Sequence, residues 1–296
     1  MMQRSPWRRP LHCLKQKRMT LLEVLQSTTA YLKKRDIESP RLNAEHLLAH
    51  ALQRRRIELY LEFERPLAET ELAPLRELVR RRGQGEPLQH LLGTVEFAGR
   101  VFLCDKRALI PRPETEELVE RIIQTAMPHP SSILDVGTGS GVIALTLAAQ
   151  FPDAEVNAID ISDDALALAR ENAARLDLQS RVRFAKGDLL TGLEGTYDLI
   201  VANLPYIANV DRPALPREVQ HDPEVALLAG DRGDELVRAL ISSACSHLRP
   251  GGMLALEVGT GQAEGLALLL SEKNYYDIAV IRDYCGVTRF LFGKYG

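Results

Sequence analysis

The sequence lacks the long apolar runs, paired cysteines and strong net charge that mark several common classes of protein. No stretch approaches the roughly eighteen apolar residues that a membrane-spanning helix needs, so we expect no membrane span. The four cysteines are scattered and form no CxxC pair, which argues against a zinc site or a disulfide framework and favours a reducing cytoplasm. The formal charge of -3 argues against binding nucleic acid by overall electrostatic attraction.

The chain is long enough for a core domain and a smaller one, and its first residues differ from both. With 296 residues and 45% hydrophobic residues, it has the composition of an ordinary globular protein. Residues 1–19 form a basic tail that we expect to be disordered. A start of translation at Met19 instead of Met1 is an alternative, and a targeting peptide is disfavoured because the tail has no apolar region.

Residues 20–85 contain helical patterns only, and residues 86–110 contain strand patterns. Ser39-Pro40 is typical of a helix start, with serine as N-cap and proline in the first turn, and residues 69–82 form another helical segment. Residues 20–85 are therefore predicted to be a small helical domain. Alternating apolar residues on either side of Gly99 predict that residues 86–110 form a β-hairpin linker.

Residues 111–296 alternate between strand and helix patterns. The expected strands are 133–136, 154–159, 182–185, 199–202, 253–258, 276–281 and 287–293, and the expected helices are 142–149, the segment after Ser162, 236–248 and 263–270. This alternation predicts an α/β domain with a mostly parallel, seven-stranded sheet and helices on both faces.

A glycine-rich segment follows the first of these strands and opens a helix. Its candidate cofactor contacts are Asp135, Gly137, Thr138, Gly139, Ser140 and Gly141. Glycines let the backbone turn sharply and let a ligand approach it closely. The GxGxG spacing differs from the GxGxxG of dinucleotide-binding folds, which favours S-adenosylmethionine over NAD. A tight strand-to-helix turn without a ligand is the alternative.

Acidic residues at the ends of the next two strands complete the candidate cofactor site. Asp160, followed by Ile161, can accept hydrogen bonds from both hydroxyl groups of a ribose. Asp188, followed by Leu189, stands where the amino group of an adenine is often held. The alternatives are a helix-capping role for Asp160 and an ordinary loop acid at Asp188.

The fourth strand ends in Asn203-Leu204-Pro205-Tyr206, at the edge where open α/β sheets bind ligands. A planar amide or aromatic amine is a poor nucleophile, because its nitrogen lone pair is delocalised. The Asn203 side chain and the Leu204 backbone offer carbonyl groups that can hold an NH2 group, Tyr206 offers a ring for stacking, and Pro205 stiffens the loop. Placement in line with a methyl donor would provide most of the acceleration. A turn with a core tyrosine is the alternative.

These motifs together resemble those of class I, Rossmann-like methyltransferases that act on planar nitrogens. The helical N-terminal region, residues 86–90, the 109–116 segment and the closing residues 282–284 further resemble the HemK-type family of release-factor glutamine methyltransferases. The resemblance covers roughly residues 20–295. It implies S-adenosylmethionine as cofactor, S-adenosylhomocysteine as product, no metal, and peptide chain release factors as protein partners. The acceptor would be N5 of the glutamine in their Gly-Gly-Gln motif.

The resemblance also implies that the helical domain of residues 20–85 recognises the substrate by helping to bind the release factor, and it implies further residues around the acceptor pocket. Asn203 and the backbone of Leu204-Pro205 would hold the glutamine amide. Glu218 would belong to an insertion after the fourth strand that shapes the pocket, and Arg112, Pro113 and Glu116 would support it from the other side. A structural salt bridge of Arg112 or Glu116 is an equal alternative to direct contact. We also expect a cytoplasmic monomer without a direct nucleic-acid partner.

One departure from the family pattern leaves other acceptors open. Leu204 stands where the family usually has a second proline, and Asn-Leu-Pro-Tyr also resembles rRNA adenine dimethyltransferases. The alternatives are therefore an N6-adenine methyltransferase acting on RNA or DNA and a ribosomal-protein glutamine methyltransferase. A ligand-binding scaffold without activity is a third hypothesis, which predicts loss of Asn203 or Tyr206, although both are present.

Overall fold

The computed structural model describes residues 19–125 and 130–296. Its contacts divide the chain into two compact units, with the boundary between Gly85 and Glu86. The expectation of a disordered tail falls on residues 1–18, outside the described residues.

The first unit is made of helices. These are α1 (Leu21–Lys33), α2 (Pro40–Leu52), α3 (Arg56–Leu59) and α4 (Glu69–Gly83). A capping box begins α1, because the Thr20 hydroxyl accepts from the Glu23 backbone N–H while the Glu23 carboxylate accepts from the Thr20 N–H. Ser39 precedes α2 as expected, but its side chain makes no capping hydrogen bond, so the fixed φ of Pro40 provides the helix start.

The second unit begins with a short helix and a hairpin. These elements are α5 (Leu88–Leu92), β1 (Thr94–Phe97) and β2 (Arg100–Leu103). The hairpin appears where it was expected, whereas α5 occupies residues that the sequence pattern assigned to strands. Gly93, with φ of 70°, ends α5 and turns the chain into β1. Phe97 and Phe102 meet edge to face at 6.1 Å between ring centroids and belong to the core of this unit.

A seven-stranded sheet forms the centre of the second unit. Its strands are β3 (Ser132–Val136), β4 (Glu155–Asp160), β5 (Val182–Lys186), β6 (Tyr197–Asn203), β7 (Leu248–Glu257), β8 (Tyr275–Arg282) and β9 (Thr288–Tyr295). Their order in the sheet is β5-β4-β3-β6-β7-β9-β8. Strand β9 pairs antiparallel with both β7 and β8, and the other four pairings are parallel, so the predicted mostly parallel, seven-stranded sheet is confirmed.

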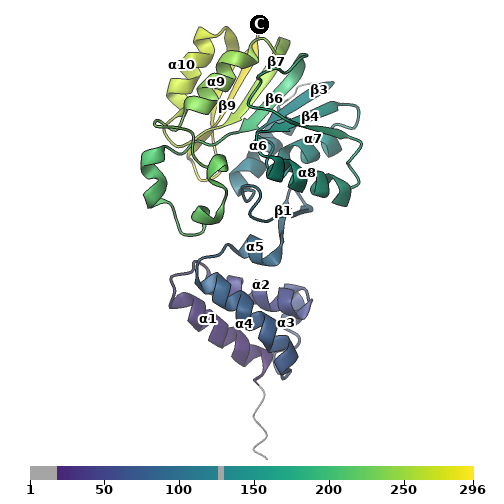
Figure 1. The fold of residues 1–296 in the computed structure, drawn as a ribbon, viewed down its shortest axis with the longest axis vertical. Coiled ribbons are helices and arrows are strands. Elements are labelled where there is room, and N and C mark those ends of the chain that lie inside the picture. The colour runs from purple at the N-terminus through teal and green to yellow at the C-terminus, as the bar shows by residue number, and fades with distance from the viewer. Residues whose placement is uncertain (1–18, 126–129) are drawn as a thin grey trace, which may run out of the picture. The chain divides into compact units, whose positions relative to one another are not determined.

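Helices cover both faces of this sheet (Figure 1). One face packs against α6 (Pro113–Gln124), α7 (Val142–Gln150) and α8 (Asp163–Arg175), and the other against α9 (Glu235–Ala244) and α10 (Ala263–Glu272). Strand β3 shows why: Ile133 points to the first core and Leu134 to the second, and neither is exposed. A strand buried on both faces needs such a continuous apolar run.

Helix α9 ends four residues earlier than its sequence pattern predicts. The prediction extended it to Leu248, with the turn at Pro250-Gly251-Gly252 as its end. In the structure the Tyr197 backbone N–H donates to the His247 carbonyl at 2.8 Å, and Leu248 pairs with Tyr197. Leu248 is therefore the first residue of β7 and is not part of α9. The Pro-Gly-Gly segment lies inside β7, near an irregularity in the register between β6 and β7.

Between β6 and α9 the chain makes an excursion that we call the insertion, residues 207–228. It contains three short 3₁₀-helices: η1 (Asn209–Ala214), η2 (Val219–His221) and η3 (Glu224–Ala226). A short bridge pins its base, because the Ile207 N–H donates to the Leu227 carbonyl at 3.1 Å and the Ala229 N–H donates to the Ile207 carbonyl at 3.0 Å. The insertion is thus tied to the end of β6.

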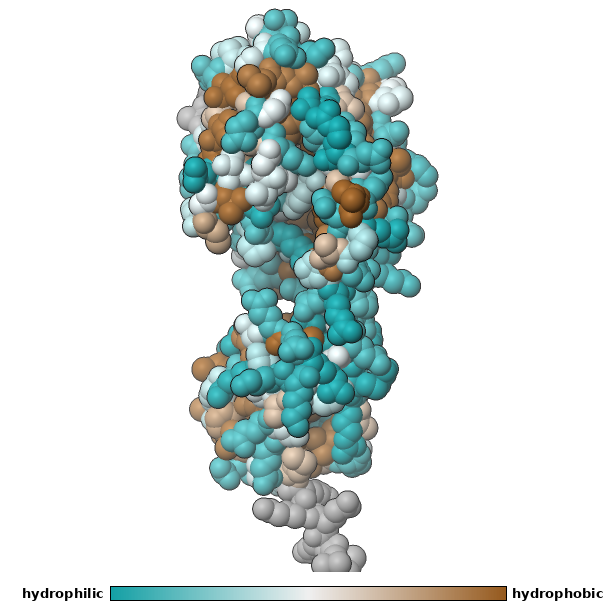
Figure 2. Space-filling model, turned by 90° about the vertical axis from the view of Figure 1, so that its left-hand side faces the viewer, coloured by the Kyte–Doolittle hydropathy of each residue, from teal (hydrophilic) through white to brown (hydrophobic). Residues whose placement is uncertain are grey.

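The surface carries apolar residues among polar ones. On the face shown in Figure 2, hydrophobic residues of the second unit reach the surface in separate small groups between hydrophilic ones. Within residues 19–125 and 130–296, no helix combines the length and the apolar character needed to cross a membrane.

Candidate functional site

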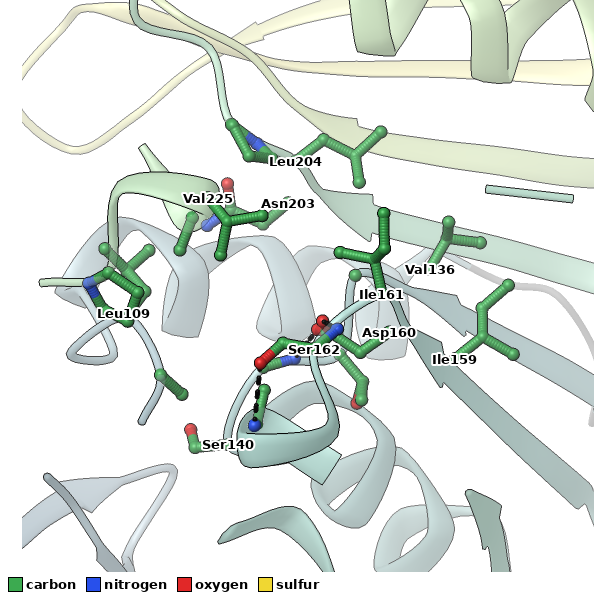
Figure 3. A pocket seen from close by; sticks show the side chains of 18 of the residues that line it. Leu109, Val136, Ser140, Ile159, Asp160, Ile161, Ser162, Asn203, Leu204 and Val225 are labelled. Atoms are coloured by element: carbon green, nitrogen blue, oxygen red, sulfur yellow. Dashed lines mark hydrogen bonds between the residues drawn. The ribbon is translucent and has the colours of Figure 1, made fainter. Parts of the chain in front are cut away.

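A cavity of about 250 Å³ lies at the carboxyl ends of β3, β4 and β6. We call it the first cavity; Figure 3 shows residues of these strand ends around it. The predicted cofactor contacts that line it are Gly137, Thr138, Gly139, Ser140, Asp160, Ile161, Asp188, Leu189 and Asn203, joined by Leu204 and Pro205. The structure thus brings the glycine loop, Asp160, Asp188 and residues 203–205 to one place, as expected for the crevice of an open α/β sheet.

The glycine loop is shaped by backbone hydrogen bonds and positive φ angles. Gly137 and Gly139 have φ of 73° and 56°, a region that glycine adopts without a Cβ clash. The Asp160 carboxylate accepts from the Gly139 N–H at 2.8 Å and from the Ser162 N–H at 2.9 Å. Asp160 therefore ties the loop after β3 to the start of α8 while it also faces the cavity.

Two residues of the glycine segment lie behind the cavity wall, in contrast to the expectation that they contact a cofactor. Asp135 has no exposed surface, and its carboxylate accepts from the Thr138 hydroxyl at 2.6 Å and from the Ala144 N–H at 3.1 Å. Burial raises the pKa of Asp135 to about 7. A Cβ on Gly141 would lie 3.1 Å from the Ala169 Cβ, so this glycine permits close packing of α7 and α8. Asp135 thus stabilises the glycine loop by hydrogen bonds, and Gly141 stabilises it by allowing close helix packing.

A second cavity adjoins the first. Its lining includes the whole Asn203-Leu204-Pro205-Tyr206 segment, Arg112, Glu114 and Arg289, and apolar residues of the insertion. Five residues line both cavities: Leu109, Asn203, Leu204, Pro205 and Ala226. Three residues of the Asn203–Tyr206 segment are therefore part of the common wall between the two cavities.

Asn203 is held by buried side chains that the sequence patterns did not single out. Its amide NH2 group donates to the Thr115 hydroxyl at 2.8 Å, and Thr115 donates to the Glu257 carboxylate at 2.8 Å. Burial raises the pKa of Glu257 to about 7, although hydrogen bonds from Thr115 and Asn203 act in the opposite direction. The strand pattern could have pointed to Glu257, because an acidic residue at the end of one strand lies beside Asn203 at the end of the neighbouring strand.

Tyr206 lines the second cavity with a partly buried side chain. Burial raises the pKa of its hydroxyl to about 12, so the ring is neutral at physiological pH. Its backbone carbonyl accepts from the Gln262 side-chain amide at 3.0 Å, and the same amide donates to the Gly233 carbonyl at 3.0 Å. The backbone that carries Tyr206 is thus fixed to the start of α10.

Arg112 forms a salt bridge and also lines the second cavity. Its guanidinium donates to the buried Asp222 carboxylate at 2.7 Å, and the Ile110 N–H donates to the other oxygen at 3.3 Å. Burial raises the pKa of Asp222 despite the charge of Arg112. Asp222 therefore anchors the insertion to the segment before α6. Arg112 forms the structural salt bridge, and its direct contact with an acceptor stays a prediction.

The three other predicted pocket residues line neither cavity. Pro113 is the first residue of α6 and starts the helix. The Glu116 carboxylate accepts from the Ala98 N–H at 2.9 Å, so it caps the turn of the β1–β2 hairpin. Glu218 stands at the start of η2 and is partly exposed. Among the described residues, no group of histidine, cysteine and acidic side chains is arranged to hold a metal ion.

Solved structures with this architecture include methyltransferases of different substrates. The hMettl16 catalytic domain, solved in complex with MAT2A 3'UTR hairpin 6, has a TM-score of 0.54 and 17% identity, over 76% of this chain and 82% of that one. A Thermus thermophilus 16S rRNA methyltransferase in complex with AdoMet and guanosine has a TM-score of 0.51 and 20% identity, over 69% of this chain and 50% of that one. At such identities these likenesses show the fold alone.

Sequence comparisons identify a narrower group. Residues 23–93 match the family described as PrmC N-terminal domain, and residues 114–219 match the family described as methyltransferase small domain. The release factor glutamine methyltransferase of Geobacter sulfurreducens is 41% identical over 94% of this chain and 97% of its own length. The enzyme of the same name from Salmonella typhimurium is 38% identical over 88% of this chain and 94% of its own length. The chain therefore belongs to the family of release factor glutamine methyltransferases.

Proposed function

We propose that this protein transfers a methyl group from S-adenosylmethionine to N5 of the glutamine in the Gly-Gly-Gln motif of peptide chain release factors. The observation that carries the proposal is that Asn203, Leu204 and Pro205 line both cavities and so form part of their common wall, while Tyr206 lines the second cavity. A methyl donor in the first cavity and an amide in the second would meet at this wall. Family membership, over nearly the full length of the chain, supports the choice of acceptor.

The residues of the first cavity suit S-adenosylmethionine. Gly137 and Leu204 both line this cavity, and the absence of a Cβ on Gly137 lets the glycine loop pass directly against the Leu204 side chain. Each Asp160 oxygen already accepts one backbone N–H and retains a second lone pair for a ribose hydroxyl. Ile161 and Leu189 offer apolar contacts for an adenine, and Asp188 an acceptor for its amino group. When bound, the cofactor supplies the electrophilic methyl group of its sulfonium.

The second cavity suits a flat, uncharged amide. The Asn203 NH2 group is engaged by Thr115, which leaves its carbonyl oxygen to accept an N–H of the acceptor glutamine. The Leu204 backbone carbonyl would accept the other N–H, and the neutral Tyr206 ring would pack against the amide plane. These contacts hold the nitrogen in one orientation, and positioning of this kind can provide a large part of the acceleration.

The remaining features extend the proposal to the whole chain. The helical unit, which contains most of the match to the PrmC N-terminal domain, would bind the release factor outside its Gly-Gly-Gln loop. The insertion would cover the acceptor cavity. A cytoplasmic monomer is the form in which we expect the enzyme to meet its substrate, because release factors act in translation.

The test is a labelling experiment with three candidate acceptors. The protein is incubated with radiolabelled S-adenosylmethionine and a release factor, ribosomal protein or rRNA, and tryptic peptides of the labelled product are examined by mass spectrometry. We expect one added methyl group on the glutamine of the Gly-Gly-Gln peptide, and none in a release factor with alanine at that position. Label in rRNA but not in the release factor would identify an adenine methyltransferase instead. Asn203→Ala should abolish turnover and leave cofactor affinity near that of the wild type.

A further inference from the structure

The amide of Asn203 is backed by two side chains that face away from solvent. Thr115, in the first turn of α6, is 4% exposed, and Glu257, at the end of β7, is 1% exposed. Asn203 donates to Thr115 and Thr115 donates to Glu257, each at 2.8 Å. The three groups come from distant parts of the sequence and form one continuous chain of hydrogen bonds.

The donor-to-acceptor direction of these hydrogen bonds determines which end of the Asn203 amide faces the cavities. A threonine hydroxyl has one hydrogen, and here it goes to the Glu257 carboxylate. The Thr115 oxygen can then only accept, so its partner on Asn203 must be the NH2 group. The carbonyl oxygen is left as the polar group that Asn203 can offer to an acceptor. A flipped amide would present two donors there and would repel the N–H groups of a glutamine.

We infer that Thr115 and Glu257 are positioning residues, which hold the Asn203 amide with its carbonyl oxygen toward the acceptor glutamine. This inference rests on the proposed function for its catalytic consequence. The orientation of the amide itself depends only on contacts within the protein.

The electrostatic surroundings of Glu257 make the hydrogen bonds among Asn203, Thr115 and Glu257 sensitive to pH. Burial is the main cause that brings the Glu257 pKa to about 7; Glu114 of α6 raises it further and Arg289 of β9 lowers it. Tyr206, the other titratable group that faces Glu257, stays neutral in this range. An ionised Glu257 can only accept from Thr115, whereas a protonated one can donate to it and free the Thr115 hydrogen for the Asn203 carbonyl. Turnover should therefore fall as the pH drops through about 7.

The first test removes the hydroxyl and then restores it. Thr115→Val keeps the shape of the side chain, and we expect kcat to fall about 10- to 100-fold, the range for a lost buried hydrogen bond. Thr115→Ser should recover most of that loss. Thr125→Val, which removes a more exposed hydroxyl just after α6, is the control and should behave like the wild type. Calorimetric binding of S-adenosylmethionine checks that each variant is folded.

The second test concerns the acid. Glu257→Gln keeps an acceptor oxygen for Thr115 but cannot titrate, so the decline of kcat below pH about 7 should disappear in this variant. Wild-type kcat in Thr115→Val, or a loss in Thr115→Ser as large as in Thr115→Val, would overturn the inference. If kcat of Glu257→Gln declines below pH about 7 as it does in the wild type, Glu257 has no part in positioning Asn203.

A measurement without substrate separates this inference from the proposed function. The Asn203 side-chain amide is assigned in NMR spectra as the NH2 pair that Asn203→Ala lacks. We expect slow hydrogen exchange of this pair in the wild type and in Thr115→Ser, and faster exchange in Thr115→Val. If that pattern appears but no release factor is methylated, positioning stands and the proposed function fails. If release factor is methylated and exchange is the same in all variants, the positioning inference fails alone.

Discussion

The side chain of Leu204 lies against the backbone of Gly137. A Cβ added to Gly137 would stand 2.8 Å from the Leu204 Cδ2 atom, closer than side chains approach one another. Leu204 itself is 5% exposed and belongs to the core on the α9–α10 face of the sheet. The residue that replaces the family's usual proline thus joins the proposed acceptor loop directly to the glycine loop.

Gly137→Ala tests this contact. The new Cβ would clash with Leu204 and would also impose a side chain at φ of 73°. Gly192→Ala is a matched control, because Gly192 has the same φ of 73° but open space around its missing Cβ. We expect Gly137→Ala to lower the free energy of unfolding by about 2 kcal/mol more than Gly192→Ala and to weaken S-adenosylmethionine binding. Urea titrations and calorimetry measure both, and equal losses in the two variants would contradict the contact.

Asp160→Ala tests the acid at the end of β4. Its removal takes away the proposed ribose acceptor and leaves the Gly139 and Ser162 N–H groups without their partner. We expect S-adenosylmethionine affinity to fall by about 1–3 kcal/mol. Asp163→Ala, three residues further along, removes an exposed carboxylate paired with Lys186 and should leave the affinity unchanged. A similar affinity for Asp160→Ala and the wild type would exclude Asp160 from the cofactor site.

Local patterns carried most of the fold and the proposed cofactor site. The glycine loop and Asp160 belong to one strand–helix–strand stretch, so their meeting at the carboxyl edge of the sheet follows from the alternation alone. The strand β7 was also expected, but its start was not. Leu248 continues an apolar helix pattern, and only its pairing with Tyr197, a long-range contact, assigns it to the sheet.

Side-chain partners far apart in the sequence could not be predicted in the same way. Thr115 lies 88 residues from Asn203 and 142 residues from Glu257. Asp222 and Arg112 are 110 residues apart, and no local sequence pattern shows that they pair. The local motif at Asp135 likewise does not show where its side chain points, which is inward, toward hydrogen bonds that hold the loop. Sequence spacing places a residue on a strand end, whereas rotamer and packing decide which way it faces.

Asp135→Asn tests the buried carboxylate under the glycine loop. Because burial raises its folded pKa to about 7, above the ordinary value near 3.9, its contribution to stability is complete in acid and is lost as the pH rises through 7. Between pH 5 and 9 the wild type should lose on the order of 2–3 kcal/mol relative to Asp135→Asn. Urea titrations at both pH values measure the difference in unfolding free energy between the two proteins. The titration of Glu257 occurs in both and cancels in this difference. The exposed Asp153→Asn should follow the wild type, and a constant difference for Asp135→Asn would refute this pKa.

Asp222→Asn tests whether the insertion grips the release factor. The buried carboxylate accepts from Arg112 and from the Ile110 N–H, so an amide of the same shape loses the charge that holds Arg112 and loosens the wall of the second cavity. We expect KM for the release factor to rise about tenfold and S-adenosylmethionine affinity to change much less, because Arg112, the partner of Asp222, lines the second cavity and not the first. Asp211→Asn, an exposed acid of the same insertion, is the control and should keep the wild-type KM. If KM is unchanged in Asp222→Asn, the release factor is held without help from this anchor.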